Sequence, residues 1–422
     1  MKLRKIIIIA LAVMLAFLPG CQRNDPDGRT ILTWAIWDYD MTVYYRPLID
    51  AYQDMNPHVR IDHVDLGSAD FMTVLGTQLS GGAHLDVLSI KDIPGYANLV
   101  RQNRLEPLSD FSRTAGIDTG LYGGTVEQIT VDGEFYALPF RSDFWLIFYN
   151  KDLFDEAGVP WPGNEMTLDE YEAIARSVTG GTGANRVFGA HYHTWRSAVQ
   201  LFGILDGQNS IVDGNYDFLA PYYEQVLRMQ NDNIVQSYSM LRTSGTHYSG
   251  VFFNNQIAMM NMGTWFIATQ IDRVAAGESR AVNWGLVKYP VPAGVSPGTT
   301  LGTITALGVN RNSRNKDLAL DFLKFVTGSE GAAILADYGV IPAILDDYVI
   351  DTIAATPGFP EDEGSKEALR VHRAYLEMPM HPRSADIELI LNEAHDNIMT
   401  INTTVERGIQ EMNDRVTRLL EN

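Results

Sequence analysis

Residues 31–64, with the sequence ILTWAIWDYDMTVYYRPLIDAYQDMNPHVRIDHV, hold the pattern that decides the fold. Ile31 to Trp37 is a short apolar run of the kind that forms a strand. Apolar residues then recur at positions 41, 44, 45, 48, 49 and 52, which is the spacing of one helix face. Asn56-Pro57 ends this helix, and Val59 to Val64 is typical of a second strand. The stretch therefore predicts a strand, a helix and another strand in succession.

The same alternation continues beyond this stretch. Apolar residues at 71, 72, 75 and 79 predict a helix that ends at Gly81-Gly82. Leu85 to Ile90 predicts a third strand, and Pro94 suits the first turn of a third helix. Alternating strands and helices form a parallel sheet with helices on both faces. The loops at 37–40, 65–68 and 91–92 then lie at the edge where open α/β sheets bind ligands.

Further elements follow along the chain. Apolar runs predict four more strands, at Phe144 to Tyr149, Gln256 to Met262, Trp284 to Val291 and Leu301 to Val309. Val126 to Val131 and Glu134 to Leu138 flank Asp132-Gly133 and predict a hairpin. Thr167 to Glu170 is a capping box that starts a helix, and the last hundred residues show helical patterning.

The first twenty residues predict a signal peptide. Lys2, Arg4 and Lys5 precede an apolar run from Ile6 to Leu18, which is shorter than the roughly 20 residues that cross a bilayer as a helix. The run leads into Leu18-Pro19-Gly20-Cys21, which resembles the lipobox of bacterial lipoproteins and contains the only Cys of the chain. We expect lipidation of Cys21, a tether at 21–29 and an extracytoplasmic protein anchored to the bacterial membrane. The alternative is an ordinary secretory leader with an incidental Cys.

Composition excludes several classes of protein. The chain has 422 residues, with 52 Asp plus Glu against 32 Lys plus Arg and a net charge of −20. This length is enough for two or three domains with cores, and the negative charge argues against a nucleic-acid partner. The sequence contains no Walker A loop, no G-x-S-x-G motif, no H-E-x-x-H motif and no Cys pair. We therefore predict no catalytic residue, no bound metal and no cofactor.

Aromatic residues stand beside polar groups at four places where strands or loops end. These places are Trp37-Asp38, Asp143-Phe144-Trp145, His193-Thr194-Trp195 and Gly263-Thr264-Trp265. A sugar ring offers an apolar face to an indole and a rim of hydroxyls to carboxylates, amides and Arg. The pattern indicates a carbohydrate site that also uses Arg141, and the alternative for each Trp is core packing, as we expect for Trp34.

Seven motifs, in this order, resemble one known family. They are Asn56-Pro57-x-Val59, Ser80-Gly81-Gly82 with Leu85-Asp86-Val87, Tyr136 to Phe140, Tyr149-Asn150-Lys151-Asp152-Leu153-Phe154 with Ala157-Gly158, Thr167-x-Asp169-Glu170-Tyr171, Ala258 to Trp265, and Phe322 to Thr327. The family is that of the carbohydrate-type extracellular solute-binding proteins of bacterial ABC transporters (family 1), which contains maltose-binding protein. The resemblance covers nearly the whole chain after the leader.

The resemblance implies a two-lobed α/β fold of the class II periplasmic-binding-protein type. Each lobe is then a mostly parallel sheet flanked by helices, and hinge crossings join the lobes. The implied N-terminal lobe is 30–138 plus 292–328, and the implied C-terminal lobe is 139–291 plus 329–422. Such a protein closes on a sugar or oligosaccharide and delivers it, as a monomer, to the permease of an ABC importer.

Matched residue by residue, the resemblance places Asp38, Asp143 and Trp265 at ligand-binding positions and Lys91 and Asp92 in a loop that reaches ligand. Met262-Gly263 replaces the family's usual Asn-Gly before the stacking Trp, which leaves the particular sugar open. Two other functions remain open from the residues. One is a lipid-anchored polysaccharide-active enzyme with Asp38 and Asp143 as an acid pair, and the other is a receptor for a cationic solute such as a polyamine.

Overall fold

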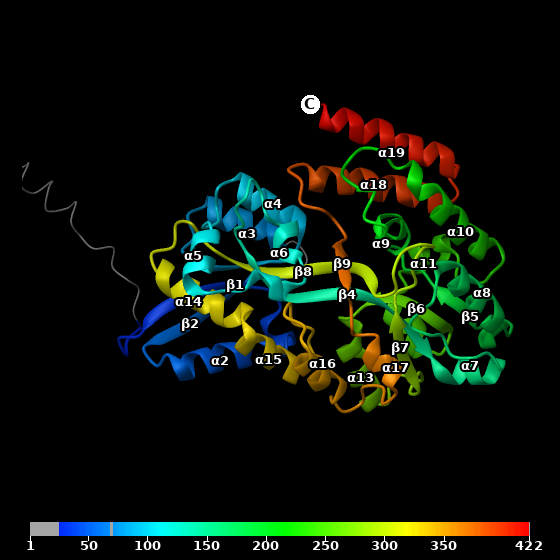
Figure 1. The fold of residues 1–422 in the computed structure, drawn as a ribbon, viewed down its shortest axis with the longest axis horizontal. Helices are drawn as coiled ribbons and strands as arrows, with labels where there is room; N and C mark the ends of the chain where they lie inside the picture. Colours follow the sequence, from blue (N-terminus) through cyan, green and yellow to red (C-terminus); the bar gives the residue numbers. More distant parts are fainter. Residues whose placement is uncertain (1–24, 68–70, 422) are drawn as a thin grey trace, which may run out of the picture.

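The computed structural model describes residues 25–67 and 71–421 as an α/β protein built on one curled sheet (Figure 1). The strands follow the spatial order β2-β1-β3-β8-β4-β6-β5, while β7 pairs with β4 and β9 with β8. Their bounds are β1 Thr30–Ile36, β2 Val59–Asp65, β3 Val87–Ile90, β4 Leu138–Asn150, β5 Phe188–His191, β6 Ile257–Gly263, β7 Trp284–Lys288, β8 Thr299–Val309 and β9 Arg373–Leu376.

Strand β4 connects the two halves of the sheet. Its first part pairs with β8, from Leu138 opposite Leu307 to Phe144 opposite Gly302, with a register shift after Pro139. Its second part pairs with β6 and β7, beginning where Trp145 lies opposite Gly263. Figure 1 shows β4 and β8 running along the long axis of the molecule, between a group of helices on each side. We call the part around β1, β2 and β3 the N-terminal lobe and the part around β5, β6 and β7 the C-terminal lobe.

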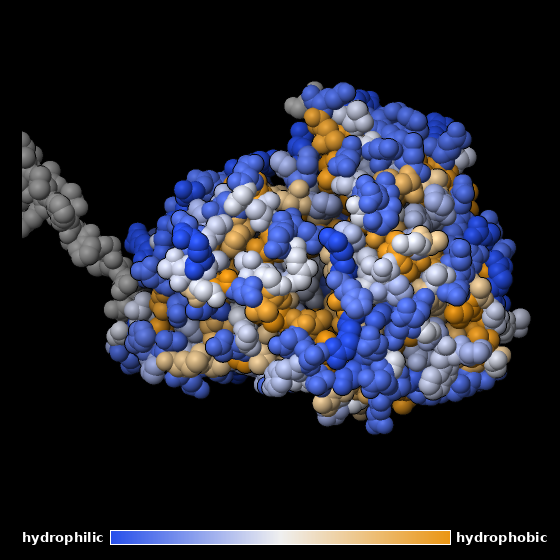
Figure 2. Space-filling model, in the orientation of Figure 1, coloured by the Kyte–Doolittle hydropathy of each residue, from blue (hydrophilic) through white to orange (hydrophobic). Residues whose placement is uncertain are grey.

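Helices cover both lobes, as the sequence predicts. In and around the N-terminal lobe they are α2 Tyr45–Met55, α3 Phe71–Ser80, α4 Ile93–Arg101, α5 Ser109–Ala115, α6 Thr125–Gln128, α14 Lys316–Thr327 and α15 Ser329–Asp337. The others are α7 Lys151–Ala157, α8 Leu168–Val178, α9 Ser197–Gln200, α10 Ala220–Asn231, α11 Tyr238–Ser244, α12 Tyr248–Phe253, α13 Phe266–Ala275, α16 Asp347–Ala354, α17 Glu363–Glu367, α18 Ser384–Met399 and α19 Val405–Leu420. Figure 2 shows hydrophilic side chains over most of one face, with smaller apolar patches between them.

Each lobe has its own apolar core. In the N-terminal lobe Trp34 is fully buried, and its ring lies 5.2 Å, centroid to centroid, from both Tyr45 and Phe322. The expectation that Trp34 is a core residue is confirmed. Ala332 and Leu335 of α15 join this same core, beyond the expected limit of the lobe at residue 328. The division of the chain into lobe ranges stays a prediction.

The class of fold is as expected, but the sheet is mixed rather than mostly parallel. Among the described residues, four of the eight strand pairings are parallel and four are antiparallel. The antiparallel pairings all involve β4 or β8, the long strands that cross between the lobes: β8 runs opposite to β3 and β4, and β4 runs opposite to β6, β7 and β8. Parallel pairing is confined to the strands linked through helices, such as β1 with β2 and β3.

Two expected elements are wrong in part. The strand predicted from Val126 is α6, because Val126 turns into the apolar core as part of a helical turn that follows Gly124. Only the turn of the hairpin survives: Asp132 and Gly133 both have positive φ, at 52° and 81°, and Val131 bridges Glu134. The last hundred residues also contain strand β9, which the helical patterning did not reveal.

Helix starts follow the sequence signals closely. Thr167 Oγ1 accepts the backbone N–H of Glu170 at 3.2 Å, and the Glu170 carboxylate accepts the N–H of Thr167 at 2.8 Å. The predicted capping box of α8 is therefore confirmed. Asn150 is the last residue of β4, and its side-chain oxygen caps α7 by accepting the N–H of Leu153 at 3.4 Å. This cap explains why an Asn stands where the strand ends and the helix begins.

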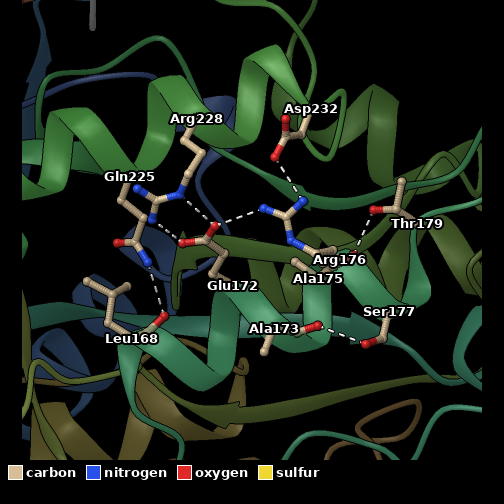
Figure 3. Close-up of polar contacts among 10 residues, drawn as sticks. All are labelled: Leu168, Glu172, Ala173, Ala175, Arg176, Ser177, Thr179, Gln225, Arg228 and Asp232. Atoms are coloured by element: carbon tan, nitrogen blue, oxygen red, sulfur yellow. Dashed lines mark hydrogen bonds and ion pairs between the residues drawn. The ribbon is translucent and has the colours of Figure 1, made fainter.

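Helix α8 is braced against α10 by charged side chains (Figure 3). The carboxylate of Glu172 lies 2.6 Å from Arg228 Nη2 and 3.1 Å from Arg176 Nη2. Arg176 also lies 2.8 Å from Asp232, which follows α10. These bonds hold the pKa of Glu172 below its usual range, chiefly through Arg228. The cluster joins two helices, so its charges are used in packing.

The predicted signal peptide and Cys21 lie outside the described residues. The described part of the predicted tether is a tight turn, because the Asp25 carboxylate accepts the N–H groups of Asp27 and Arg29 at 3.0 and 2.8 Å. Across residues 25–67 and 71–421, no helix has both the length and the apolar character needed to cross a membrane. In the same residues, no three His, Cys, Asp or Glu side chains are grouped so that they could hold a metal ion.

Candidate functional site

A cavity of about 670 Å³ lies where the C-terminal lobe meets the long crossing strands. Its wall is formed by strands β4 and β8, the start of α9 with the loop before it, helices α11 and α18, the turn after β6 and the residue after β9. Its lining consists of Trp145, Thr194, Trp195, Arg196, Ser197, Arg242, Trp265, Thr303, Glu377, Glu388, Asn392 and Asp396. We call this cavity the cleft pocket.

Three indoles form one side of the cleft pocket. Trp145, Trp195 and Trp265 lie edge to face, with centroid separations of 6.2 Å for 145–195, 5.9 Å for 145–265 and 6.2 Å for 195–265. Trp145 is fully buried, whereas Trp195 keeps 37% of its surface exposed and Trp265 is half-buried. Trp145 therefore supports the other two rings, and these present apolar surface to the cleft pocket.

Gly263 fixes the position of the Trp265 ring. A Cβ atom at residue 263 would overlap the indole of Trp265, so only glycine allows the ring to fold back over the end of β6. The sequence departs from the family pattern at Met262-Gly263 by having Met in place of Asn, but it keeps the glycine that this close approach requires.

Charged side chains of the lining are paired with one another or with an indole. Arg196, which is 4% exposed, lies 3.1 Å from Glu388, and Arg242 lies 3.0 Å from Asp396. Glu377 accepts a hydrogen bond from the indole N–H of Trp145. Because the Arg residues already have carboxylate partners, the cleft pocket suits a neutral ligand that takes part in hydrogen bonds rather than one that brings its own charge.

The carboxyl of Glu377 has an unusual proton affinity. Desolvation raises its pKa to about 7, and the Trp145 N–H and the charge of Arg196 oppose the shift without cancelling it. Near neutral pH, Glu377 therefore exists in both forms, so it can donate a hydrogen bond to a ligand hydroxyl as well as accept one.

Replacing Glu377 by Gln should flatten the pH dependence of stability. The folded pKa of about 7 exceeds the ordinary value of 4.5, so Glu377's stabilising contribution is fully present below about pH 4.5 and is lost as the pH rises through about 7. Gln keeps an acceptor for Trp145 but does not titrate. The Tm of the natural protein minus that of Glu377→Gln, measured from about pH 4 to 8, should fall across this window. A difference that stays constant with pH would contradict the shifted pKa.

Arg141 and Asp143 lie on β4 beside the cleft pocket, outside its lining. Arg141 Nε is 3.3 Å from the Asp143 carboxylate, and Arg141 Nη1 donates to the hydroxyl of Tyr44 at 3.4 Å. The Asp143 carboxylate also accepts the hydroxyl of Thr264 at 3.0 Å. These hydrogen bonds and the ion pair thus connect Tyr44, just before α2 in the N-terminal lobe, with Thr264, next to Trp265 in the C-terminal lobe.

The predicted residues of the N-terminal lobe lie at the carboxyl ends of β1 and β3. Trp37 is 8% exposed and packs its edge on Phe71 at 4.9 Å, and Lys91 Nζ lies 5.5 Å from the Trp37 ring. Asp38 has a φ of 50° and donates its backbone N–H to Asp65 at 3.1 Å. The loops after β1 and β3 therefore lie at the carboxyl edge of the sheet, as the strand order predicts.

Among these residues of the N-terminal lobe, Asp92 has a pKa that is influenced by a residue of the cleft pocket, Glu388. Asp92 caps α4 by accepting the N–H of Gly95 at 2.6 Å. The Asp92 side chain is exposed, yet desolvation, followed by the charge of Glu388, still raises its pKa. Asp92 directly precedes α4, which contacts α18, the helix that carries Glu388.

The structure brings together only part of the predicted site. Trp145, Trp195 and Trp265 line the cleft pocket, Arg141 and Asp143 adjoin it, and the N-terminal lobe residues lie on the facing edge. His193 is 8% exposed and packs behind Trp195, with ring centroids 4.5 Å apart. Burial lowers the pKa of His193 to about 4, so it is a neutral support for the indole. Which of these residues contact ligand stays a prediction.

Sequence reasoning missed most of the cleft wall. The missed residues that carry a charge or an amide are Arg196, Arg242, Glu377, Glu388, Asn392 and Asp396. Arg196 follows Trp195 directly and could have been found from that neighbour. The others lie in segments with only helical patterning, and no local signal shows that α18 returns to the cleft or that β9 delivers Glu377 to it.

Comparison with known proteins assigns the class. Residues 40–333 match the model of the family described as bacterial extracellular solute-binding protein. This chain belongs to that family. The family and the class of fold that the motifs predict are both confirmed.

Individual relatives agree with this assignment. A crystal structure of a sugar transporter from Rhizobium etli, in an open conformation, is 53% identical and covers 92% of this chain and 99% of its own, with a TM-score of 0.88. The lactose-binding protein of Rhizobium radiobacter is 25% identical over 327 residues, covering 73% of this chain and 74% of the relative. The arabinooligosaccharide-binding protein of Bacillus subtilis is 22% identical over 343 residues, covering 78% and 77%.

Proposed function

We propose that this solute-binding protein captures a sugar or oligosaccharide in the cleft pocket and delivers it to the permease of an ABC importer. The observation that carries the proposal is that two partly exposed indoles, Trp195 and Trp265, line one cavity of about 670 Å³ together with hydrogen-bonding Arg and carboxylate groups. The names of the relatives, a sugar transporter, a lactose-binding protein and an arabinooligosaccharide-binding protein, support the same class of ligand.

The energy that the site can supply is sufficient for a transport receptor. Micromolar binding needs about 8 kcal/mol. Hydrogen bonds to charged groups contribute about 1.5–3 kcal/mol each, and stacking on two indoles adds to them before the cost of ordering is subtracted. Arg196, Arg242 and the carboxylates that pair with them offer such bonds to neutral hydroxyls.

Closure of the lobes is the step that couples binding to delivery. A ligand seated on the indoles of the C-terminal lobe can bridge to Asp38, Lys91 and Asp92 on the facing edge, and so stabilises the closed arrangement. Strands β4 and β8 cross between the lobes, and separate clusters of apolar residues form the cores, so a hinge movement at these strands distorts little of either core. The closed form then docks, as a monomer, on the permease.

The other functions have less support. Asp143 is held by Arg141 and Thr264, while Asp38 lies on the other lobe, so the two carboxyls make a poorly preorganised acid pair. We therefore propose that the protein is not an enzyme. Glu388 and Asp396 of the cleft pocket are already paired with Arg196 and Arg242, which leaves them less available to the ammonium groups of a polyamine. Isothermal titration with mono- and oligosaccharides, alongside spermidine, tests both points: heat of binding without sugar product is expected, and turnover or binding of spermidine alone would refute the proposal.

We also propose that Cys21 anchors the protein in the membrane. The Cys21→Ser variant, expressed in a bacterium that acylates lipoproteins, should move from the membrane fraction to the soluble fraction with its sugar affinity unchanged. Two or more acyl chains hold a protein stably at a bilayer, and without them this chain has no other proposed anchor. Persistent membrane association of the variant would contradict lipidation at this position.

A further inference from the structure

A second cavity, of about 570 Å³, lies at the opposite end of the N-terminal lobe from the cleft. It opens beside the amino ends of β1 and β3, at Thr33 and Asp86, and beside Asn310, which follows β8. The residues that face the other lobe follow the carboxyl ends of the same two strands. The length of β1 and β3 would therefore separate a ligand in this second cavity from a sugar in the cleft.

The floor of the cavity is a preformed polar frame. The Asp86 carboxylate accepts the N–H and the hydroxyl of Thr33, both at 2.9 Å, and the hydroxyl of Ser313 at 2.6 Å. Asn310 Nδ2 donates to the carbonyl of Leu85 at 2.7 Å. Asp86 is 8% exposed. Its carboxylate accepts hydrogen bonds that hold β1, β3 and the 310–315 loop together, and is therefore not available to a ligand.

The groups that remain available are positively charged or neutral donors. Arg314 is exposed and makes no hydrogen bond or ion pair with any residue in 25–67 or 71–421. Arg104 donates to Ser80 Oγ at 3.2 Å and to the Leu79 carbonyl at 3.5 Å, and its shielded Nε has no partner. Asp86 is the only acidic residue in the lining, in a chain whose net charge is −20. The lining therefore has more Arg than acidic residues, whereas the whole chain has more acidic than basic residues.

We propose that this cavity binds a phosphate group on a small organic molecule. Guanidinium groups present planar forks of N–H donors that match phosphate oxygens, and two of them here approach one cavity from separate loops, at Arg104 and Arg314. Leu79 and Leu85 form an apolar wall beside them, which suits the organic substituent. The pre-ordered frame under Asp86 lowers the cost of fixing the 310–315 loop around such a group.

Such a phosphate has two sources. One is a free phosphate ester in the extracytoplasmic space. The other is a phospholipid headgroup, because Thr30 at the start of β1 follows the proposed anchor Cys21 by only nine residues. Nine residues span at most about 30 Å, and the turn at 25–29 shortens this reach, so the anchor would hold this end of the lobe near the membrane. Both sources present the same phosphate chemistry to Arg104 and Arg314.

Titration of the purified protein with glycerol 3-phosphate, followed by calorimetry at low salt, tests the proposal, and flotation with phosphatidylglycerol vesicles gives the second arm. We expect binding in at least one arm and at least a tenfold loss for Arg314→Ala and for Arg104→Ala. Arg311→Ala is the matched control, because Arg311 carries the same charge on the same loop, bonds Asn103 and does not line the cavity. Binding to glycerol 3-phosphate identifies a free ester, and binding to vesicles alone identifies the headgroup.

Two results would overturn the proposal. One is no binding in either arm, and the other is an equal loss in Arg311→Ala and Arg314→Ala, which would mean diffuse attraction to the loop. Sugar affinity should be the same in Arg314→Ala as in the natural protein, so this test is independent of the sugar site. Melting temperatures of all three variants identify any that has lost its fold.

Discussion

Replacing Trp195 and Trp265 together by Ala should weaken sugar binding by roughly 30- to 150-fold, or about 2–3 kcal/mol, while the protein stays folded. Each ring offers a flat apolar surface to the C–H face of a sugar, and neither is deeply buried. Trp145 lies behind both and remains in place. Calorimetric titration with the tightest-binding sugar found in the screen measures the effect.

Trp161→Ala is the matched control for this experiment. Trp161 is 45% exposed, donates to Asp155 at 2.9 Å and does not line the cleft pocket. Loss of an indole at this position should leave the sugar affinity unchanged. If the double variant binds sugar as tightly as the natural protein does, then the indoles are not the stacking platform and the proposed site is wrong.

Replacing Asp143 by Ala should destabilise the protein by about 2–3 kcal/mol and lower its Tm by roughly 2–4 °C. The Asp143 side chain is 6% exposed and is the ion-pair partner of Arg141, whose side chain is 25% exposed. Removing the carboxylate leaves a mostly buried guanidinium without a counter-ion, and leaves the hydroxyl of Thr264 without its acceptor. The residual exposure of Arg141 puts the cost below the 3–5 kcal/mol found for fully buried pairs.

Two further variants separate the causes. Asp143→Asn keeps an acceptor for Thr264 but removes the charge, so it should lose most of the same stability if the ion pair dominates. Asp110→Ala removes the carboxylate of an exposed ion pair. The Asp110 side chain is 95% exposed, and its carboxylate lies 2.8 Å from Arg113. That control should change the Tm by little, since exposed pairs contribute about 0–1 kcal/mol. Equal effects of Asp110→Ala and Asp143→Ala would contradict the importance of burial.

The site could be predicted only where its residues carry local signals. Trp195 and Trp265 were named because polar groups stand beside them in the sequence, but Trp145 has the same pattern and is fully buried. Gly263 explains the position of Trp265. His193 has the same local pattern but supports Trp195 from behind, because its neighbours Trp195 and Tyr248 enclose it. Local sequence does not distinguish a ring that faces a cavity from one that backs it.

The part of the cleft that went unpredicted depends on long-range packing. Glu377 reaches the cleft because β9 pairs with β8 and because Gln128 of α6 accepts the N–H of Leu376 at 3.2 Å. These partners are separated by 248 positions in the chain, so no sequence window contains both. The raised pKa of Glu377 has the same origin, since it depends on the side chains that displace water from the carboxyl.

The sequence by itself determined the alternation of strands and helices, the starts of helices such as α8, and the family, because periodicity, caps and motifs are written in consecutive residues. Tertiary structure alone decided that β4 and β8 cross between the lobes and make the sheet mixed, that α18 closes the cleft wall, and that Arg196, Arg242 and their carboxylate partners meet there. The physical reason is that ion pairs, desolvation and cavities arise from groups that are distant along the chain and become neighbours only when the cores pack.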